Sequence, residues 1–174
     1  GGGTVKILPG NYTISAAVKL YSNVKLVGSG PSTVLKKIKG VQSKMAVDVG
    51  YGELQATLED ASGFAPGMGI QIHDARQKGG WDATTAVITA IEGNTIYFDN
   101  YTVRDYTAPN GGLVSNACPL VSAIEAENIT IANLTVDGNR AENEAMDGCR
   151  GGAIYLHKVK NVMIEGVNVK NFAS

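Results

Sequence analysis

Short runs of alternating apolar and polar residues recur in three segments of the chain that share one layout. The segments begin at Ala17, Ser122 and Ala153 and read AVKLYSNVKLVGSGPSTVLKK, SAIEAENITIANLTVDGN and AIYLHKVKNVMIEGVNVKN. In each, a short strand leads to an asparagine, followed by a second strand, a small turn and a third strand. The alternation predicts that one face of each strand is buried and the other faces water.

Strands of three or four residues cannot form a stable hairpin alone, so each three-strand unit must stack on the next. We therefore expect an all-β fold, a parallel β-solenoid with three short strands per coil. At the shared turn, Asn23, Asn128 and Asn161 should adopt the left-handed backbone region and bond their own main chain or the next asparagine. In the middle segment the pattern predicts four buried side chains: Ile129, Ile131, Leu134 and Val136.

The repeat disappears in the middle of the chain, where the pattern predicts a small antiparallel β insertion. Four strands are expected there, with a turn at 92–94 in which Gly93 and Asn94 suit positive φ. The predicted division is therefore amino-terminal coils at 1–41, the insertion at 42–116 and further coils at 117–174.

The aromatic residues of the insertion suggest a sugar-binding surface. Phe98 is predicted to lie in the core. Trp81, beside two glycines in a polar stretch, is the best candidate for an exposed ring on which a sugar could stack. His73 and Asp74 end a predicted strand, but two such residues do not make a metal site, so a surface or packing role is expected.

A Gly-rich lead, a strand, a Pro-Gly-x-Tyr turn and a Gly-x-Gly turn follow one another in residues 1–37. This order resembles the amino-terminal coil of the pectate-lyase-like superfamily of right-handed parallel β-helices, and 133–143 and 151–172 look like the next coils. The matching residues are Gly2, Gly3, Pro9, Gly10, Tyr12, Gly28 and Gly30.

The resemblance implies a right-handed β-helix and action on polysaccharide, as a lyase or a glycoside hydrolase. The superfamily also contains tailspikes and adhesins, so a glycan-binding, self-assembling or structural module without catalysis is the alternative. Its members have more coils than this chain, which implies the amino-terminal part of a longer extracellular or periplasmic protein. The enzymatic expectation applies to that longer protein. The open edge of the last coil is expected to stack on further coils or on another chain.

One stretch, residues 137–150, concentrates four acids and two arginines within fourteen residues. For a hydrolase, Asp137 and Asp147 are the predicted pair of acid and base or nucleophile. For a lyase acting on a uronic acid, Arg150, His157 or Lys158 would neutralise the substrate carboxylate or remove the neighbouring proton.

Three further residues are predicted to bind substrate: Arg140, Glu144 and Trp81. A solvated loop is the competing interpretation of the whole charged stretch. Alignment of the repeats also places Lys170 one coil away from Asp137, so an ordinary salt bridge competes with catalysis there.

Composition and charge narrow the choice of partner. A net charge of −1, a pI near 6.1 and the lack of a long run of like charge argue against nucleic acid or an anionic membrane. No uninterrupted apolar run approaches the roughly 18 residues of a membrane span. Polysaccharide is therefore the expected partner.

Neither a disulfide nor a metal is required by the sequence. Cys118 and Cys149 could pair, but two buried thiols are favoured. No metal site is predicted. Acidic groups near Asp147 leave Ca²⁺ as an open alternative, although their spacing matches no defined calcium loop.

Overall fold

The computed structural model describes residues 1–145 and 152–172. The chain divides into two compact units, each described here by itself. The first contains residues 1–38, 119–141 and 152–172, and the second contains 39–118 and 142–145. Residues 142–145, which the repeat places among the later coils, thus belong to the second unit. Within the described residues, no helix is long and apolar enough to span a membrane.

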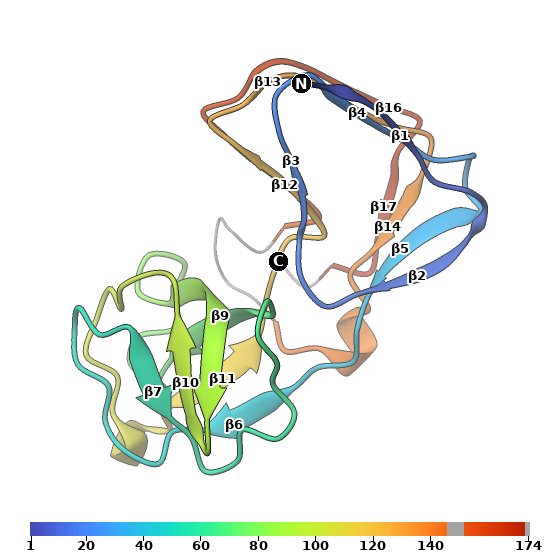
Figure 1. Ribbon diagram of the computed structural model, residues 1–174. Helices are drawn as coiled ribbons and strands as arrows, with labels where there is room; N and C mark the ends of the chain where they lie inside the picture. The colour runs from blue at the N-terminus through green and yellow to red at the C-terminus, as the bar shows by residue number, and fades with distance from the viewer. Residues whose placement is uncertain (146–151, 173–174) are drawn as a thin grey trace. The chain divides into compact units, whose positions relative to one another are not determined.

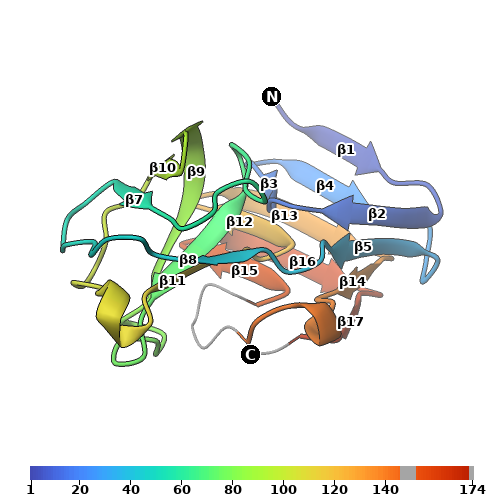
Figure 2. The same cartoon turned by 90° about the horizontal axis from the view of Figure 1, so that it is seen from below.

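The first unit consists of parallel strands in three sheets (Figures 1 and 2). In spatial order, the first sheet contains β1 (Gly3–Lys6), β4 (Val24–Val27), β13 (Glu127–Ala132) and β16 (Lys160–Glu165). The second contains β15 (Ile154–His157), β12 (Val121–Ile124) and β3 (Val18–Leu20). The third contains β17 (Asn168–Lys170), β14 (Thr135–Asp137), β5 (Thr33–Lys37) and β2 (Gly10–Ile14). A short 3₁₀ helix, η2 (Arg140–Glu142), follows β14.

The chain visits the three sheets in turn, and each circuit lies against the previous one. Strands β3, β4 and β5 form one circuit, β12, β13 and β14 the next, and β15, β16 and β17 the last. The expectation of parallel strands that stack coil on coil is confirmed as a β-helix-like arrangement. Figure 1 shows β2, β5, β14 and β17 side by side.

The core of the first unit lies between the three sheets. The four side chains predicted to be buried in the middle coil are each at most 1% exposed: Ile129, Ile131, Leu134 and Val136. Within the described residues, no strand pairs with the outer edge of the last coil. Ile164 and Val169, the register partners of Ile131 and Val136, are accordingly half-exposed.

Asparagines stack at one corner of successive coils, as the sequence predicts. Asn23, Asn128 and Asn161 have φ of 66°, 58° and 52°. The Nδ2 of Asn128 donates to Oδ1 of Asn23 at 2.8 Å, and the Nδ2 of Asn161 donates to Oδ1 of Asn128 at 2.7 Å. Each amide thus fixes the register of two coils, and asparagine tolerates the left-handed backbone of the corner.

Glycine and asparagine also occupy the next corner of successive coils. Gly28, Asn133 and Gly166 follow register-paired residues of β4, β13 and β16. Asn133 and Gly166 have φ of 55° and 59°. A Cβ on Gly28 would overlap the backbone of Asn133, so close approach of two coils requires glycine there.

The second unit is a six-stranded antiparallel sheet. Its order is β6 (Gln42–Lys44), β11 (Leu113–Asn116), β8 (Gly69–His73), β9 (Thr84–Glu92), β10 (Thr95–Phe98) and β7 (Gln55–Thr57). A 3₁₀ helix, η1 (Ala108–Asn110), precedes β11. One face of the sheet is apolar, with Ile70, Ile72 and Val114 fully buried.

The turn between β9 and β10 differs in part from the expectation. Gly93 has φ of 58°, as predicted, but Asn94 is not among the residues with positive φ. The Asn94 side chain instead accepts a bond from the Ala61 N–H and donates to the Glu59 carbonyl. Asn94 therefore serves as a tether to the 59–61 segment.

The asparagine corner gives a first prediction about stability. Replacing Asn128 by alanine or by glycine removes the same side-chain bonds, but only alanine is strained at φ of 58°. We expect N128A to be less stable than N128G by about 1–2 kcal/mol in urea unfolding. An N128G protein as unstable as N128A would contradict this role of the left-handed backbone.

Candidate functional site

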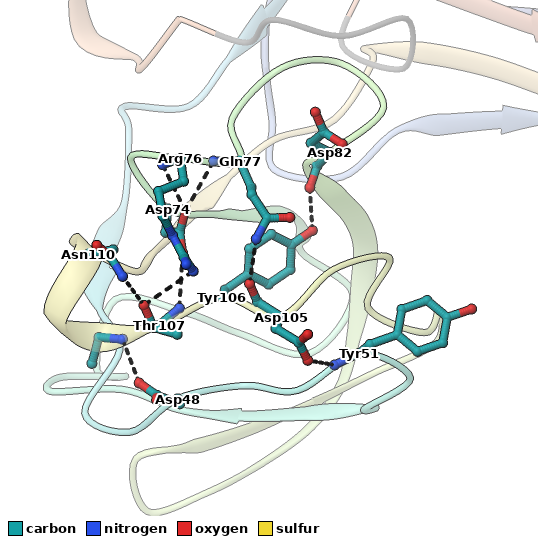
Figure 3. A network of polar contacts seen from close by, with 11 residues as sticks. Asp48, Tyr51, Asp74, Arg76, Gln77, Asp82, Asp105, Tyr106, Thr107 and Asn110 are labelled. Carbon is teal, nitrogen blue, oxygen red and sulfur yellow. Dashed lines mark hydrogen bonds and ion pairs between the residues drawn. The ribbon is translucent and has the colours of Figure 1, made fainter.

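A polar network fixes the loops at one end of the second unit (Figure 3). Its centre is Asp74, which follows β8 and is fully buried. The Asp74 carboxylate accepts bonds from the backbone N–H groups of Arg76, Gln77 and Thr107 at 2.9–3.1 Å. The Arg76 guanidinium adds a bond of 2.8 Å.

Burial by itself raises the pKa of Asp74, but the bonds from Arg76 and Thr107 outweigh it and leave the pKa below its ordinary value. The carboxylate thus joins the turn after β8 to the segment before η1.

A buried tyrosine holds the loop that carries Trp81. The Tyr106 hydroxyl donates to the Asp82 carbonyl at 2.6 Å and bonds Thr84 Oγ1 at 2.8 Å, as Figure 3 shows for Asp82. The Arg104 guanidinium binds the Asp82 carboxylate at 2.9 Å. The residue after Trp81 is therefore fixed through both its backbone and its side chain. The Trp81 ring itself is 82% exposed.

Two exposed tyrosines lie on bonded loops of the same unit. The Tyr51 N–H donates to Oδ1 of Asp105 at 2.8 Å, and its ring points away from the network in Figure 3. The Gly52 N–H donates to the Thr102 carbonyl, so the backbone segments that carry Tyr51 and Tyr101 are paired. Tyr51 is 73% and Tyr101 62% exposed. We call Tyr51, Trp81 and Tyr101 the aromatic loop surface.

A second polar cluster lies on the other, less apolar face of the sheet. Gln71 and His73 alternate along β8 and so share a face, and Ser115 on β11 is the register partner of Gln71. The Glu144 carboxylate receives His73 Nε2 at 2.9 Å, Gln71 Nε2 at 3.0 Å and Ser115 Oγ at 2.5 Å. The three donors on the sheet are all buried.

These bonds change the acidity of Glu144. Burial by itself raises its pKa, but the bonds from His73 and Ser115, the charge of His73 and the bond from Gln71 hold the pKa below its ordinary value. An ionised carboxylate only accepts, so Nε2 of His73 must carry a proton. The Nδ1 of His73 is buried and has no hydrogen-bond partner among the described residues.

Asp137, the first predicted catalytic residue, is occupied by contacts within the first unit. It is buried, and its Oδ1 accepts bonds from the Asn139 N–H at 2.9 Å and Asn171 Nδ2 at 3.0 Å. Lys170 Nζ lies 3.6 Å from Oδ2, so the competing salt bridge is present. Burial raises the pKa of Asp137, but the bonds from Asn139 and Asn171 and the charge of Lys170 leave it lowered.

Three other predicted site residues lie in the first unit: His157 at the end of β15, Lys158 directly after it, and Arg140 in η2. The exposed Lys158 has φ of 51° and pairs with Glu125 of the preceding coil at 2.8 Å. His157 is exposed and stacks on Tyr155, with ring centroids 6.2 Å apart. Arg140 is exposed in η2. No contact between any two of these three side chains is found in the described part of the chain.

The predictions on Asp147, Arg150 and Cys149 fall outside the described residues. Cys118 is buried. Among residues 1–145 and 152–172, no group of three or more His, Cys, Asp or Glu side chains is arranged to hold a metal ion.

Sequence reasoning missed the partners of Glu144. The sequence does not single out Gln71 or Ser115, and it predicts only a surface or packing role for His73. One available signal was the Gly-Ile-Gln-Ile-His alternation of β8, which places two polar side chains on one face of a strand with isoleucines on the other. Glu144 is 71 residues away from His73, and no local pattern links them.

No family model and no curated protein matches the chain. Among solved structures, it is similar to the tailspike gp61 of Pseudomonas phage phi297, with 12% identity and a TM-score of 0.41 over 94% of this chain and 42% of that one. It is also similar to the gp54 tailspike of Acinetobacter baumannii bacteriophage AP22, solved in complex with A. baumannii capsular saccharide. That match has 14% identity and a TM-score of 0.40 over 92% and 31% of the two chains.

A third match is the tailspike gp49 of Pseudomonas phage LKA1, with 12% identity and a TM-score of 0.36 over 78% of this chain and 30% of that one. The chain thus spans less than half the length of each of these tailspikes. Because no family model matches, the pectate-lyase-like assignment stays a prediction.

The lowered pKa of Glu144 predicts a contribution to stability that depends on pH. A carboxyl whose pKa is lower in the folded state stabilises the fold above its unfolded pKa, and that stability is lost as the pH falls through the folded pKa. Wild type should therefore lose more unfolding free energy than E144Q between about pH 5 and pH 3. Urea unfolding at several pH values measures this.

The exposed Glu53 provides the matched control for that titration. E53Q should follow wild type, because it keeps Glu144 together with the other carboxyls of lowered pKa, which are Asp60, Asp74 and Asp137. Equal slopes for E144Q and wild type would contradict a stabilising Glu144 cluster.

Removal of the Tyr106 hydroxyl should loosen the loop that holds Trp81. Y106F leaves the Asp82 carbonyl without its donor, which should cost about 1–2 kcal/mol. Because Trp81 is the single tryptophan, its fluorescence anisotropy reports on the loop directly. We expect lower anisotropy in Y106F and no change in Y101F; unchanged anisotropy in Y106F would show that the loop is held by other contacts.

Proposed function

We propose that the chain is a glycan-binding module, in which the second unit binds sugar through the aromatic loop surface. The observation that carries the proposal is the combination of exposed rings with loops fixed by buried polar bonds. Trp81 is exposed while the next residue is held by Tyr106 and Arg104. Such a ring offers an apolar face to the C–H groups of a sugar at a small cost in ordering.

Polar side chains on the same loops are available for bonds to sugar hydroxyls. Asp105 accepts from the Tyr51 N–H, Gln77 donates to the Asp105 carbonyl, and Arg104 binds Asp82, the residue after Trp81. Carboxylates accept and guanidinium groups donate, so both kinds of hydroxyl contact are available. Binding sites of this kind are commonly formed by loops on a rigid sheet.

In the first unit, the described candidate residues favour binding over catalysis. The carboxylate oxygens of Asp137 contact Asn139, Asn171 and Lys170. Lys158 is paired with Glu125. A general acid or base needs access to the substrate proton. Hydrolysis or elimination by a longer protein, with Asp147 or Arg150, stays a prediction.

The proposed fold of the first unit is the right-handed parallel β-helix that its repeats predict. Connections between parallel strands of one sheet are right-handed in about 98% of cases, which supports this hand. Polysaccharides of cell surfaces are outside the cytoplasm, so the proposed location is extracellular or periplasmic.

Substitution of the exposed aromatic residues tests the proposed function. With a panel of neutral and acidic polysaccharides, W81A should weaken binding about tenfold, equivalent to roughly 1.4 kcal/mol, and Y51A or Y101A should weaken it less. Y21A, which removes a 71% exposed ring of the first unit, is the matched control and should bind like wild type. Binding of a glycan that is equal in wild type and W81A would contradict the proposed surface.

The same panel separates binding from turnover. Incubation should yield neither new reducing ends nor the absorbance of unsaturated products. Either product would favour the enzymatic alternative over a binding module.

A further inference from the structure

We propose that Gln71, His73 and Ser115 form a carboxylate-binding pocket, which Glu144 fills in this structure and which accepts the carboxylate of an acidic sugar when Glu144 withdraws. The pocket shares no residue with the aromatic loop surface. Its existence does not depend on the proposed function, but the choice of a sugar acid as its ligand rests on that function.

The donors are carried by two strands of the sheet, whose pairing holds their backbones in place. Gln71 and Ser115 are register partners on β8 and β11, and Gln71 Nε2 lies 3.1 Å from Ser115 Oγ. His73 is two residues further along β8, on the same face. With Glu144 bound, Gln71, His73 and Ser115 are 4%, 9% and 2% exposed, so their bonds to the carboxylate are shielded from water.

The three donors match one ionised carboxylate. Ser115 and Gln71 both bond Oε2 of Glu144, and His73 bonds Oε1. Bonds to an ionised acceptor are stronger than neutral ones, and both oxygens are engaged. A neutral hydroxyl or amide offers fewer lone pairs to three converging donors, so the pocket selects for a carboxylate.

The acceptor, by contrast, comes from a segment outside regular structure. Glu144 follows η2, lies in no strand, and its side chain is 27% exposed. Two residues before Glu144, the Glu142 carbonyl accepts a bond from the Gly40 N–H at 2.6 Å, which anchors the segment in the second unit. A carboxylate on such a segment can be exchanged for an external one without disturbing the sheet.

His73 indicates that Glu144 does not satisfy the pocket completely. Its Nε2 binds Glu144, but its Nδ1 is buried and has no hydrogen-bond partner among the described residues. A buried polar atom without a partner is costly. Glu144 binds only Nε2 and leaves this cost in place.

Chemical rescue tests the pocket without any glycan. E144A should unfold at lower urea than wild type, and sodium acetate at pH 7 should restore its midpoint in a concentration-dependent way, compared with sodium chloride at equal ionic strength. Wild type should not respond, because Glu144 already fills the pocket. E53A, which lacks an exposed glutamate elsewhere in the unit, is the matched control and should not respond to acetate either.

The double variant Q71L/E144A removes a donor and should lose the rescue. If E144A does not fold, E144S is used instead, since its short side chain also leaves the position of the carboxylate empty. Absence of acetate rescue in the folded variant would overturn the pocket.

The ligand class is tested by binding of acidic and neutral oligosaccharides. A uronic-acid oligosaccharide should bind E144A at least tenfold more tightly than wild type, because it no longer competes with Glu144, whereas a neutral one should bind both equally. Rescue by acetate with equal uronate binding in the two proteins would overturn the sugar acid as the ligand. Failure of every polysaccharide to bind wild type while acetate still rescues E144A would reject the glycan-binding function and leave the carboxylate pocket standing.

Discussion

Stacking between coils is the constraint on which the first unit depends. Strands of three to six residues, such as β3 and β13, have too few bonds to hold a hairpin, so each coil is stable only against its neighbours. Stacking requires that the corners coincide in every coil. The bonds from Asn161 to Asn128 and from Asn128 to Asn23 enforce this, because a shift of one residue would break both. The buried row of Leu26 and Ile131 follows from that register.

The same local regularity explains what the sequence could predict. Ile131 and Asn128 belong to a local pattern that recurs in every coil. Burial and backbone conformation can therefore be inferred from a few residues. The pairing of Asp137 with Lys170 was predictable for the same reason, since aligned repeats give the contacts between coils. The exposed Trp81 was predictable from its glycine-rich surroundings.

The second unit was less predictable because its important contacts are not periodic. Tyr106 bonds Asp82 across 24 residues, and Glu144 bonds His73 across 71. Such contacts depend on how antiparallel strands fold back on one another, and no repeated sequence pattern predicts them. The side chain of Asn94 shows the same limit on a small scale. It suits a left-handed turn, yet it bonds a distant segment instead.

Asp137 and Glu144, two of the carboxyls with a lowered pKa, differ in what can replace them. The partners of Asp137 are Asn139 in its own turn and residues of the next coil, so its bonds are part of the stack itself. Loss of Asp137 would therefore remove bonds that join two coils. Glu144 enters its site from an irregular segment, and its donors remain on the sheet when it leaves. A partly exposed carboxylate whose donors lie on a separate sheet is therefore where a ligand can compete, and this distinction is visible only in three dimensions.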